Sequence, residues 1–155
     1  DLTEADGGDL AWAGIGQYTI TANPLNFMVY MGAIANGGIA VKPRILAGGG
    51  IFEEALAFSD KEDRILEKST AETLKRMMRN NVLSKYGESN FKGLELCAKT
   101  GTAEVGKGVK PHAWFAGFLN REDAPYAFVV IVENGGSGSQ VAGAVAAKVL
   151  KAAVK

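Results

Sequence analysis

The sequence predicts an α+β fold in which an antiparallel sheet of three strands packs against helices. Two observations support this prediction. Helical patterns occupy residues 24–35, 69–82 and 139–153, on both sides of a group of strands. The three extended apolar segments follow one another with short connections: 94–102, 113–119 and 126–132. Because the strands are grouped and do not alternate with helices, parallel β–α–β units are not expected.

The composition fits one globular domain and excludes several classes of function. The chain has 155 residues, 47% of them apolar and 22% charged, which suffices for one hydrophobic core. Basic and acidic residues both number 17, so the zero net charge gives no indication of a nucleic-acid partner. The single Cys97 excludes an internal disulfide, and the single His112 argues against a histidine-rich metal site. We therefore expect no metal and no cofactor.

The ends and the apolar runs of the sequence carry further expectations. No apolar run reaches membrane-spanning length, and no signal peptide opens the chain. The first residue is Asp1 rather than Met, which fits a shortened or processed piece. Residues 1–22 are rich in glycine, and we expect them to be irregular.

The first helix is predicted from its boundaries and its apolar content. Asn23 suits the N-cap, and Pro24 suits the first helical position. Nearly every side chain from Pro24 to Ala35 is apolar, which predicts burial on almost every side. Gly37 and Gly38 then end the helix.

The segment between this helix and the strands is predicted less regularly. Residues 41–47 form a short extended piece interrupted by a proline. Ser69 and Glu72 have the spacing of a capping box, so a second helix should begin with Ser69 as its cap. Its apolar face would carry Leu74, Met77, Met78 and Val82, and its solvated face Lys75, Arg76 and Arg79. Residues 86–93 are expected to be a polar loop.

The C-terminal part completes the predicted sheet. A glycine-containing loop at 106–111 leads to the second strand, and a turn at 120–125 leads to the third. The third strand is apolar throughout, which predicts that both of its faces are covered. After a glycine-rich break, Ser139 can cap a last helix whose small residues allow close packing on the sheet.

The candidate functional residues lie at the end of the first strand. Alternation predicts that Leu94, Leu96 and Ala98 face one side of the sheet, while Glu95, Cys97 and Lys99 face the other. The strand continues through three further residues, Thr100, Gly101 and Thr102. A cation, two hydroxyls and a glycine that leaves the backbone accessible suit the binding of a carboxylate and an acyl group. Taken alone, Lys-Thr-Gly is a short string that more often marks a solvated strand end.

Several segments in order resemble one family, the penicillin-binding proteins of the monofunctional, class B-like transpeptidase type. The set is more specific than the Lys-Thr-Gly string alone, because it covers most of the chain in the order that the family has. The motif itself belongs to the characteristic set of this superfamily. The matching segments are Gly16-Gln17, Asn23-Pro24-Leu25, Ala33-Ile34-Ala35-Asn36-Gly37-Gly38, Ala98-Lys99-Thr100-Gly101-Thr102-Ala103-Glu104, Trp114-Phe115-Ala116-Gly117-Phe118 and Glu133-Asn134-Gly135-Gly136.

Two motifs of that family are not found in this sequence. The family's catalytic serine lies upstream in a Ser-x-x-Lys motif that begins a buried helix, and a Ser-x-Asn motif follows it. The sequence has no Ser-x-Asn, and its one Ser-x-x-Lys, from Ser89 to Lys92, is too close to the following strand to begin such a helix. We interpret it as a coincidence in a loop. The resemblance therefore implies that residues 1–155 are the C-terminal portion of one transpeptidase domain, without the part that carries the catalytic serine.

The resemblance implies a role for each motif residue. In the complete domain a serine activated by a neighbouring lysine attacks the D-Ala-D-Ala bond of a peptidoglycan stem peptide, a second stem peptide takes the acyl group, and β-lactams acylate the same serine. Lys99 would supply positive charge to the ligand's carboxylate, and the Thr100 and Thr102 hydroxyls would hydrogen-bond it. The Thr102 backbone N–H would be one of two oxyanion-hole donors. Gly101 would keep the strand surface open to the acyl group.

Four other residues near the motif are expected to be mainly structural. Glu104 is expected to be a solvated strand residue, and His112 to be structural. Trp114 either lines the cleft or packs in the core, and packing is favoured. Cys97 is interpreted as a packing residue.

Alternative functions remain open within the same fold. A β-lactam sensor domain or a serine β-lactamase fragment would share the Lys-Thr-Gly strand, and an unrelated interaction domain would carry it by accident. The resemblance also implies that the full-length protein is anchored at the extracytoplasmic face of a bacterial membrane. In this family two upstream strands complete the sheet, so strand 126–132 would present an unpaired edge in this chain alone. Such an edge favours oligomers or poor solubility.

Overall fold

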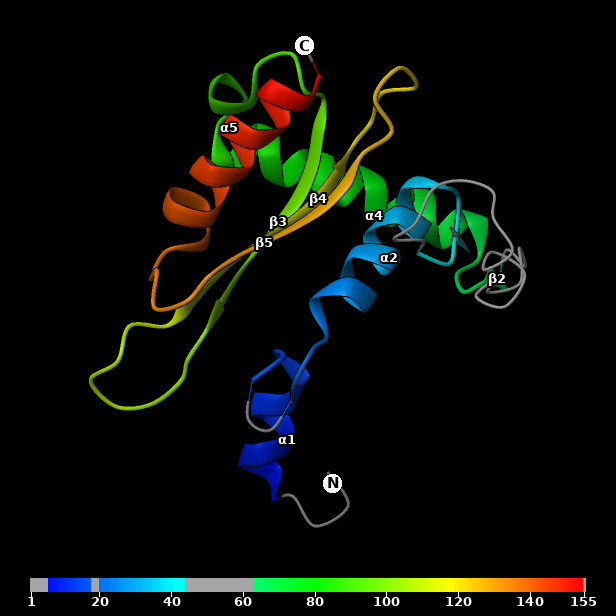
Figure 1. Cartoon of the computed structure of the whole chain (residues 1–155). Helices are drawn as coiled ribbons and strands as arrows, with labels where there is room; N and C mark the ends of the chain where they lie inside the picture. The colour runs from blue at the N-terminus through cyan, green and yellow to red at the C-terminus, as the bar shows by residue number, and fades with distance from the viewer. Residues whose placement is uncertain (1–5, 18–19, 44–62, 155) are drawn as a thin grey trace, which may run out of the picture.

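The larger sheet has three antiparallel strands, and Figure 1 shows it at the centre of the molecule. The computed structural model describes residues 6–17, 20–43 and 63–154. Strands β3 (Leu96–Ala103), β4 (His112–Leu119) and β5 (Ala127–Val132) pair in the order β3-β4-β5. This architecture confirms the predicted α+β class and the three-stranded meander.

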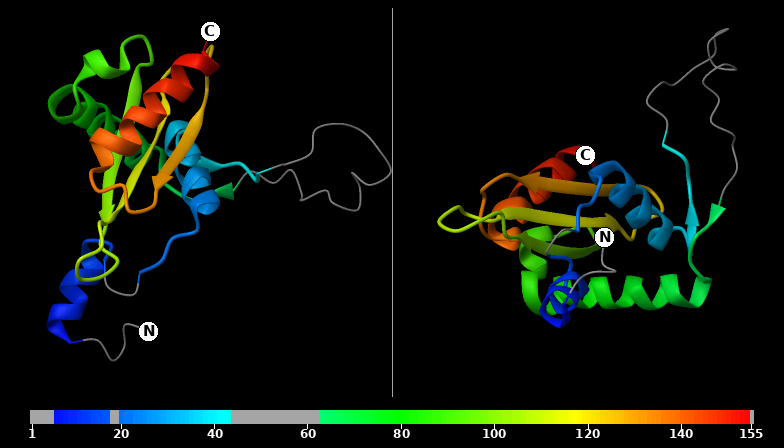
Figure 2. Two further views of the ribbon diagram at one scale, coloured as in Figure 1. Left: turned by 60° about the vertical axis from the view of Figure 1, so that its left-hand side comes forward. Right: turned by 90° about the horizontal axis from the view of Figure 1, so that it is seen from below.

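Helices cover both faces of this sheet, as the two views in Figure 2 show. One face packs against η3 (Gly138–Ala142) and α5 (Gly143–Ala153), and its core includes Leu96, Ala98 and Phe115. The other face packs against α2 (Pro24–Ala35) and α4 (Lys68–Asn81), and its core includes Cys97 and Phe118. The alternation along β3 therefore separates two cores, as its period of two predicts.

Helix α2 forms where the sequence predicts it. The Asn23 side-chain oxygen accepts hydrogen bonds from the N–H groups of Leu25, at 2.9 Å, and Asn26, at 3.3 Å. Gly38 ends the turn with φ +95°, and a Cβ there would lie 2.1 Å from the Leu66 carbonyl oxygen. The predicted burial on nearly every side is wrong at the first turn, because Leu25 is 43% exposed. The burial is limited to the part of the helix that lies on the sheet.

The N-terminal residues differ from the irregular segment that we predicted. Helix α1 spans Gly7–Gly14, and the Asp6 side chain caps it by accepting a hydrogen bond from the Asp9 N–H. The glycines lie at the two ends of the helix, where they reduce helix stability only a little. The residues in the middle of the helix are compatible with helical structure. No residue of α1 is buried, so capping and not core packing holds this helix.

The entry into α4 also differs from the prediction. Glu67 is the N-cap and makes no side-chain capping bond, so Ser69 lies inside the first turn and the capping box is wrong. The preceding residues are held by tertiary pairing, since β2 (Asp63–Arg64) pairs with β1 (Ile39–Ala40). The strand found in this region is β1. Residues 41–43 of the predicted extended piece are not in a strand, and residues 44–47 lie outside the described part.

The two faces of α4 are mixed, contrary to the prediction. Met78 and Val82 are buried, but Met77 is 60% exposed. Arg79 is not a solvated residue: its guanidinium donates to both carboxylate oxygens of Glu88, at 2.6 and 2.8 Å, and to the Leu96 carbonyl at 3.1 Å. The segment predicted as a polar loop therefore has structure that this contact holds in place.

Two short helical turns occupy residues 82–91, and the predicted loop 86–93 contains the last residue of the first turn and all of the second. The π-helical turn η1 spans Val82–Tyr86, and the 3-10 helix η2 spans Glu88–Phe91. Phe91 is buried and stacks on Phe115 with ring centroids 5.6 Å apart. An aromatic side chain in a mostly polar segment can anchor it to the core, which the sequence pattern does not reveal.

The C-terminal helix begins earlier than predicted. Ser137, not Ser139, accepts the hydrogen bond from the Gln140 N–H, and η3 precedes α5. Gly138 sets this start, because a Cβ there would lie 2.7 Å from the carbonyl oxygens of Gly101 and Trp114. Within the described residues, no helix is long and apolar enough to cross a membrane.

Strand β5 forms one edge of the sheet and is covered only in part. Phe128 is buried and most of the strand is half-buried, with side chains contributing to both cores. The predicted cover on both faces is therefore found, in weaker form, because the strand lies at an edge of the described sheet. The predicted association through this edge stays a prediction.

Candidate functional site

The predicted motif lies on the outer edge of β3, where that strand nears its end. Lys99 is exposed, and its Nζ donates to the Thr100 carbonyl oxygen at 2.6 Å. Thr100 is half-buried, and its Oγ1 lies 3.2 Å from the Tyr86 hydroxyl. The backbone N–H of Thr100 donates to the same hydroxyl at 3.1 Å. The Tyr86 hydroxyl thus contacts both the backbone and the side chain of Thr100, a predicted site residue.

Backbone carbonyls of β3 point away from β4 at every second residue. Side chains donate to them: Arg79 to Leu96, Asn81 to Ala98 at 3.4 Å, Lys99 to Thr100 and Gln17 to Thr102 at 2.8 Å. In an antiparallel strand the N–H and C=O of one residue point to the same edge. The Thr102 N–H therefore faces this open edge too, and its oxyanion-hole role stays a prediction.

Gly101 and Gly138 allow a close approach at the motif. A Cβ on Gly101 would lie 3.1 Å from the Cβ of Trp114, its cross-strand partner. Trp114 in turn packs edge-on against Phe27 of α2, with ring centroids 6.2 Å apart. Trp114 is half-buried and belongs to neither hydrophobic core, so its packing in the core stays a prediction that only the contact with Phe27 supports. A side chain at Gly101 would press against Trp114.

Two residues of the site are missed by sequence reasoning. Gln17 belongs to the segments that carry the family resemblance, and Tyr86 begins the segment predicted as a polar loop, but neither is predicted to reach the motif. Gln17 is 85 residues from Thr102 in sequence, and Tyr86 is 14 residues from Thr100. No local periodicity links residues at such separations. A polar residue next to a glycine and a tyrosine in a polar segment are the only signals that the sequence offers.

The remaining residues near the motif have no role in this arrangement of groups. His112 starts β4, and its Nδ1 accepts a hydrogen bond from the Asn134 N–H at 3.0 Å, as the structural interpretation expects. Glu104 is exposed beyond the end of β3. Ser89 lies in η2 and Lys92 after its end, both exposed, so the Ser-x-x-Lys string does not form the face of a longer helix.

Cys97 is a packing residue in the core between β3 and the helices α2 and α4. It has no exposed surface, and burial raises the pKa of its thiol to about 11. A protonated, enclosed thiol is a poor nucleophile, so it does not extend the site.

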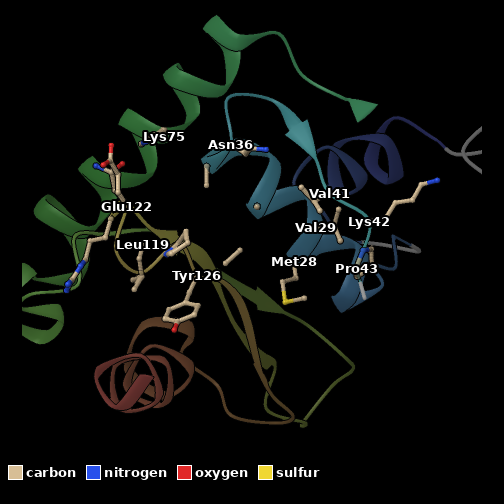
Figure 3. Close-up of a pocket in the computed structure, with 16 residues that line it drawn as sticks. Met28, Val29, Asn36, Val41, Lys42, Pro43, Lys75, Leu119, Glu122 and Tyr126 are labelled. Carbon is tan, nitrogen blue, oxygen red and sulfur yellow. The ribbon is translucent and has the colours of Figure 1, made fainter. Parts of the chain in front are cut away.

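The structure also has a separate concavity, and Figure 3 shows the residues that line it. It has a volume of about 780 Å³ and is lined by α2, Lys75 of α4, the β4–β5 turn and Tyr126. None of the four motif residues lines it. In the described ranges 6–17, 20–43 and 63–154, no group of three or more His, Cys, Asp or Glu residues could hold a metal ion.

The fold and the motif together place the chain in a known family. It belongs to the penicillin binding protein transpeptidase domain family, which it matches over residues 3–153. It is 31% identical to the peptidoglycan D,D-transpeptidase PbpA of Mycolicibacterium smegmatis, over 96% of this chain and 32% of that protein. The PbpA of Mycobacterium tuberculosis is 29% identical, over 97% of this chain and 32% of that protein. The chain thus spans about a third of the length of these relatives.

Solved structures agree with this assignment. Penicillin-binding protein A from Mycobacterium tuberculosis, in an imipenem acyl-enzyme complex, superposes with a TM-score of 0.77 at 30% identity. That match covers 97% of this chain and 35% of the other. PBP2 from Helicobacter pylori superposes with a TM-score of 0.71 at 28% identity, over 93% of this chain and 26% of the other. The chain therefore has the fold of part of a penicillin-binding transpeptidase domain.

Proposed function

We propose that this chain forms the Lys-Thr-Gly side of the ligand cleft of a D,D-transpeptidase that crosslinks peptidoglycan stem peptides. The observation that carries the proposal is the open edge of β3, where Lys99, Thr100 and Thr102 present a cation, hydroxyls and outward backbone groups. Its curated relatives are named peptidoglycan D,D-transpeptidases, which supports the same reaction here.

The motif residues divide the binding of an acyl ligand among them. Lys99 supplies positive charge to the ligand's carboxylate, and the Thr100 and Thr102 hydroxyls donate hydrogen bonds to it. The Thr102 N–H donates to the oxygen of the tetrahedral intermediate, where charge develops in the transition state. Gly101 leaves room for the acyl group along the strand.

The nucleophile of the proposed reaction comes from a serine outside this chain. The relatives are about three times as long as the aligned segment, so they contain the length that the upstream part of the domain requires. The serine attacks the D-Ala-D-Ala bond, the terminal D-Ala leaves, and the amine of a second stem peptide then takes the acyl group. This chain alone is inactive under the proposal.

β-Lactams are the second class of ligand that the proposal assigns to this site. The solved relative from Mycobacterium tuberculosis is described as an acyl-enzyme complex with imipenem, and another as one with penicillin G. Stem peptides and β-lactams would bind on the extracytoplasmic face of the membrane, where peptidoglycan lies. The names of the relatives favour a transpeptidase over a β-lactam sensor or a serine β-lactamase.

Labelling with a fluorescent penicillin tests the proposal. The 155-residue chain and a longer version that includes the upstream sequence are incubated with the probe, and intact masses are measured. We expect the adduct only on the longer protein. If the short chain gains a stoichiometric adduct, then a serine of this chain, such as Ser89, is the nucleophile and the proposal is wrong. If neither protein gains it, penicillin is not a ligand.

A further inference from the structure

The side chain of Gln17 occupies a backbone acceptor of the candidate site. Its Nε2 donates to the Thr102 carbonyl oxygen at 2.8 Å, although 85 residues separate the two. Helix α1, which leads to Gln17, lies beyond the same end of the sheet as the loop between β3 and β4 (Figure 1). The Gln17 N–H donates to the Trp12 carbonyl at 3.0 Å, so its backbone is tied to α1.

The Thr102 carbonyl is the acceptor that a peptide-like ligand would use. An extended ligand that lies along an open strand edge pairs with the outward N–H and C=O groups of that strand. At Thr102 the N–H would donate to the ligand's acyl oxygen, and the C=O would accept an amide N–H from the same ligand. A glutamine carboxamide and a ligand amide are the same kind of donor, so both compete for one oxygen.

The segment that carries Gln17 is not anchored in either hydrophobic core. No residue of α1 is buried, and Gly16 precedes Gln17 with φ +79°. By contrast, the donors to the Leu96 and Ala98 carbonyls come from α4, which packs on the sheet, whereas the Lys99 side chain that donates to the Thr100 carbonyl is exposed. A ligand can therefore displace the Gln17 contact at Thr102 without disturbing either hydrophobic core.

We propose that Gln17 is a specificity-determining residue, because its carboxamide holds the acceptor that a ligand's amide N–H requires. A ligand with such an N–H reaches the same open edge as the Gln17 carboxamide and competes with it for the Thr102 oxygen, whereas a ligand without one can bind beside it. Gln17 therefore reduces the gain in binding that a ligand obtains from an amide N–H. This inference rests on the proposed function of the Lys99–Thr102 edge.

Acylation rates of two β-lactams in the longer protein test this inference. Penicillin G carries an acylamino N–H next to its ring, and imipenem has a hydroxyethyl group in that place. The second-order acylation rate constants of both are measured for the wild type, Gln17→Ala and Gln17→Glu. Asn80→Ala is the matched control, since it removes an exposed carboxamide from α4. Thermal unfolding is measured for each variant.

We expect the ratio of the penicillin G rate to the imipenem rate to rise about 2- to 10-fold in Gln17→Ala, the range of one neutral hydrogen bond. Gln17→Glu should raise the ratio too, because an ionised carboxylate cannot donate to Thr102. Asn80→Ala should leave the ratio unchanged. An unchanged or lower ratio in both Gln17 variants overturns the inference, as does an equal fall of both rates. If the wild-type protein forms no adduct with either compound, the proposed function fails and the inference with it.

Discussion

The hydroxyl of Tyr86 lies 3.1 Å from the backbone nitrogen of Thr100 and 3.2 Å from its Oγ1. The tyrosine is at the end of η1, and its ring packs edge-on against Phe115 with centroids 5.6 Å apart. The contact with Phe115 therefore fixes the Tyr86 ring so that its hydroxyl lies beside Thr100, in the middle of the motif. Tyr86 is a positioning residue for Thr100, and this relationship gives the first prediction.

Replacing Tyr86 with phenylalanine should keep the ring packing and remove the hydroxyl. We expect a loss of about 1 kcal/mol in the free energy of unfolding, because the Thr100 N–H loses its partner. In the longer protein we expect penicillin acylation to slow by about 3- to 10-fold. Urea unfolding and acylation kinetics check this. Tyr126→Phe is the control, since Tyr126 is 45% exposed and lies at the other end of the sheet; equal effects of the two variants would contradict the positioning role.

A valine at Gly101 should abolish ligand binding. The new Cβ would lie 3.1 Å from the Trp114 Cβ, and the branched side chain would fill the space beside the strand. The measurement is fluorescent penicillin labelling of the longer protein, together with circular dichroism to show that the variant folds. Gly7→Val, at a position with no other atoms within 4 Å of its Cβ, should label normally. Normal labelling of Gly101→Val would mean that Gly101 does not keep the cleft open.

The Arg79–Glu88 pair should contribute stability that depends on pH. The Arg79 guanidinium lowers the pKa of the Glu88 carboxyl below its ordinary value of 4.5, mainly through their hydrogen bonds. A lowered pKa in the folded state means that the contribution is present above the ordinary value and is lost as the pH falls through the lowered one. The side chains are 27% and 40% exposed, so screening by water limits the effect to about 1 kcal/mol.

Glu88→Gln tests this pair against Glu72→Gln, which changes an exposed carboxylate on α4, the helix that carries Arg79. We expect Glu88→Gln to lower the urea midpoint at about pH 7 and to lower it less as the pH falls below 4.5. Glu72→Gln should have little effect at either pH. A Glu88→Gln deficit that grows as the pH falls would contradict the expected direction of the pH dependence.

The Cys97 thiol should be nearly unreactive in the folded chain. Its pKa is raised from 9.0 to about 11 by burial, which lowers the thiolate fraction at pH 7 about 100-fold by itself. The lack of exposed surface slows reaction further. Labelling with a coloured disulfide reagent should become stoichiometric only in urea. Complete labelling within minutes in native buffer would show that the β3 core opens readily.

The edge of β5 should cause this chain to associate when it is alone. Its outward backbone groups have no neighbouring strand in the described sheet, and half-buried apolar side chains lie along it. Light scattering over a range of concentrations should show a mass above 16.3 kDa that rises with concentration. The longer protein should remain a monomer if the upstream sequence covers this edge. A clean monomer of the short chain at high concentration would contradict the prediction.

Part of the fold follows from local patterns in the sequence. The apolar periods of β3, β4 and β5 predict the meander, and Asn23 with Pro24 predicts the start of α2. These features depend on neighbours within a few residues, so the sequence records them directly. The errors occur where a distant contact sets the boundary. Glu67 stands at the start of α4 in place of Ser69, just after β2 pairs with β1, and Ser137 stands in place of Ser139, where Gly138 lies against the Gly101 carbonyl.

The sequence by itself determined the strand that carries Lys99, Thr100, Gly101 and Thr102, because alternation and residue chemistry are local properties. Only the tertiary structure decided which side chains meet that strand. Tyr86 and Gln17 reach Thr100 and Thr102 after the chain folds back on itself, and Arg79 finds Glu88 across the end of a helix. The physical reason is that the N–H and C=O groups of an open strand edge form hydrogen bonds with the side chains that tertiary packing places beside them. That packing depends on the whole chain and not on the local sequence.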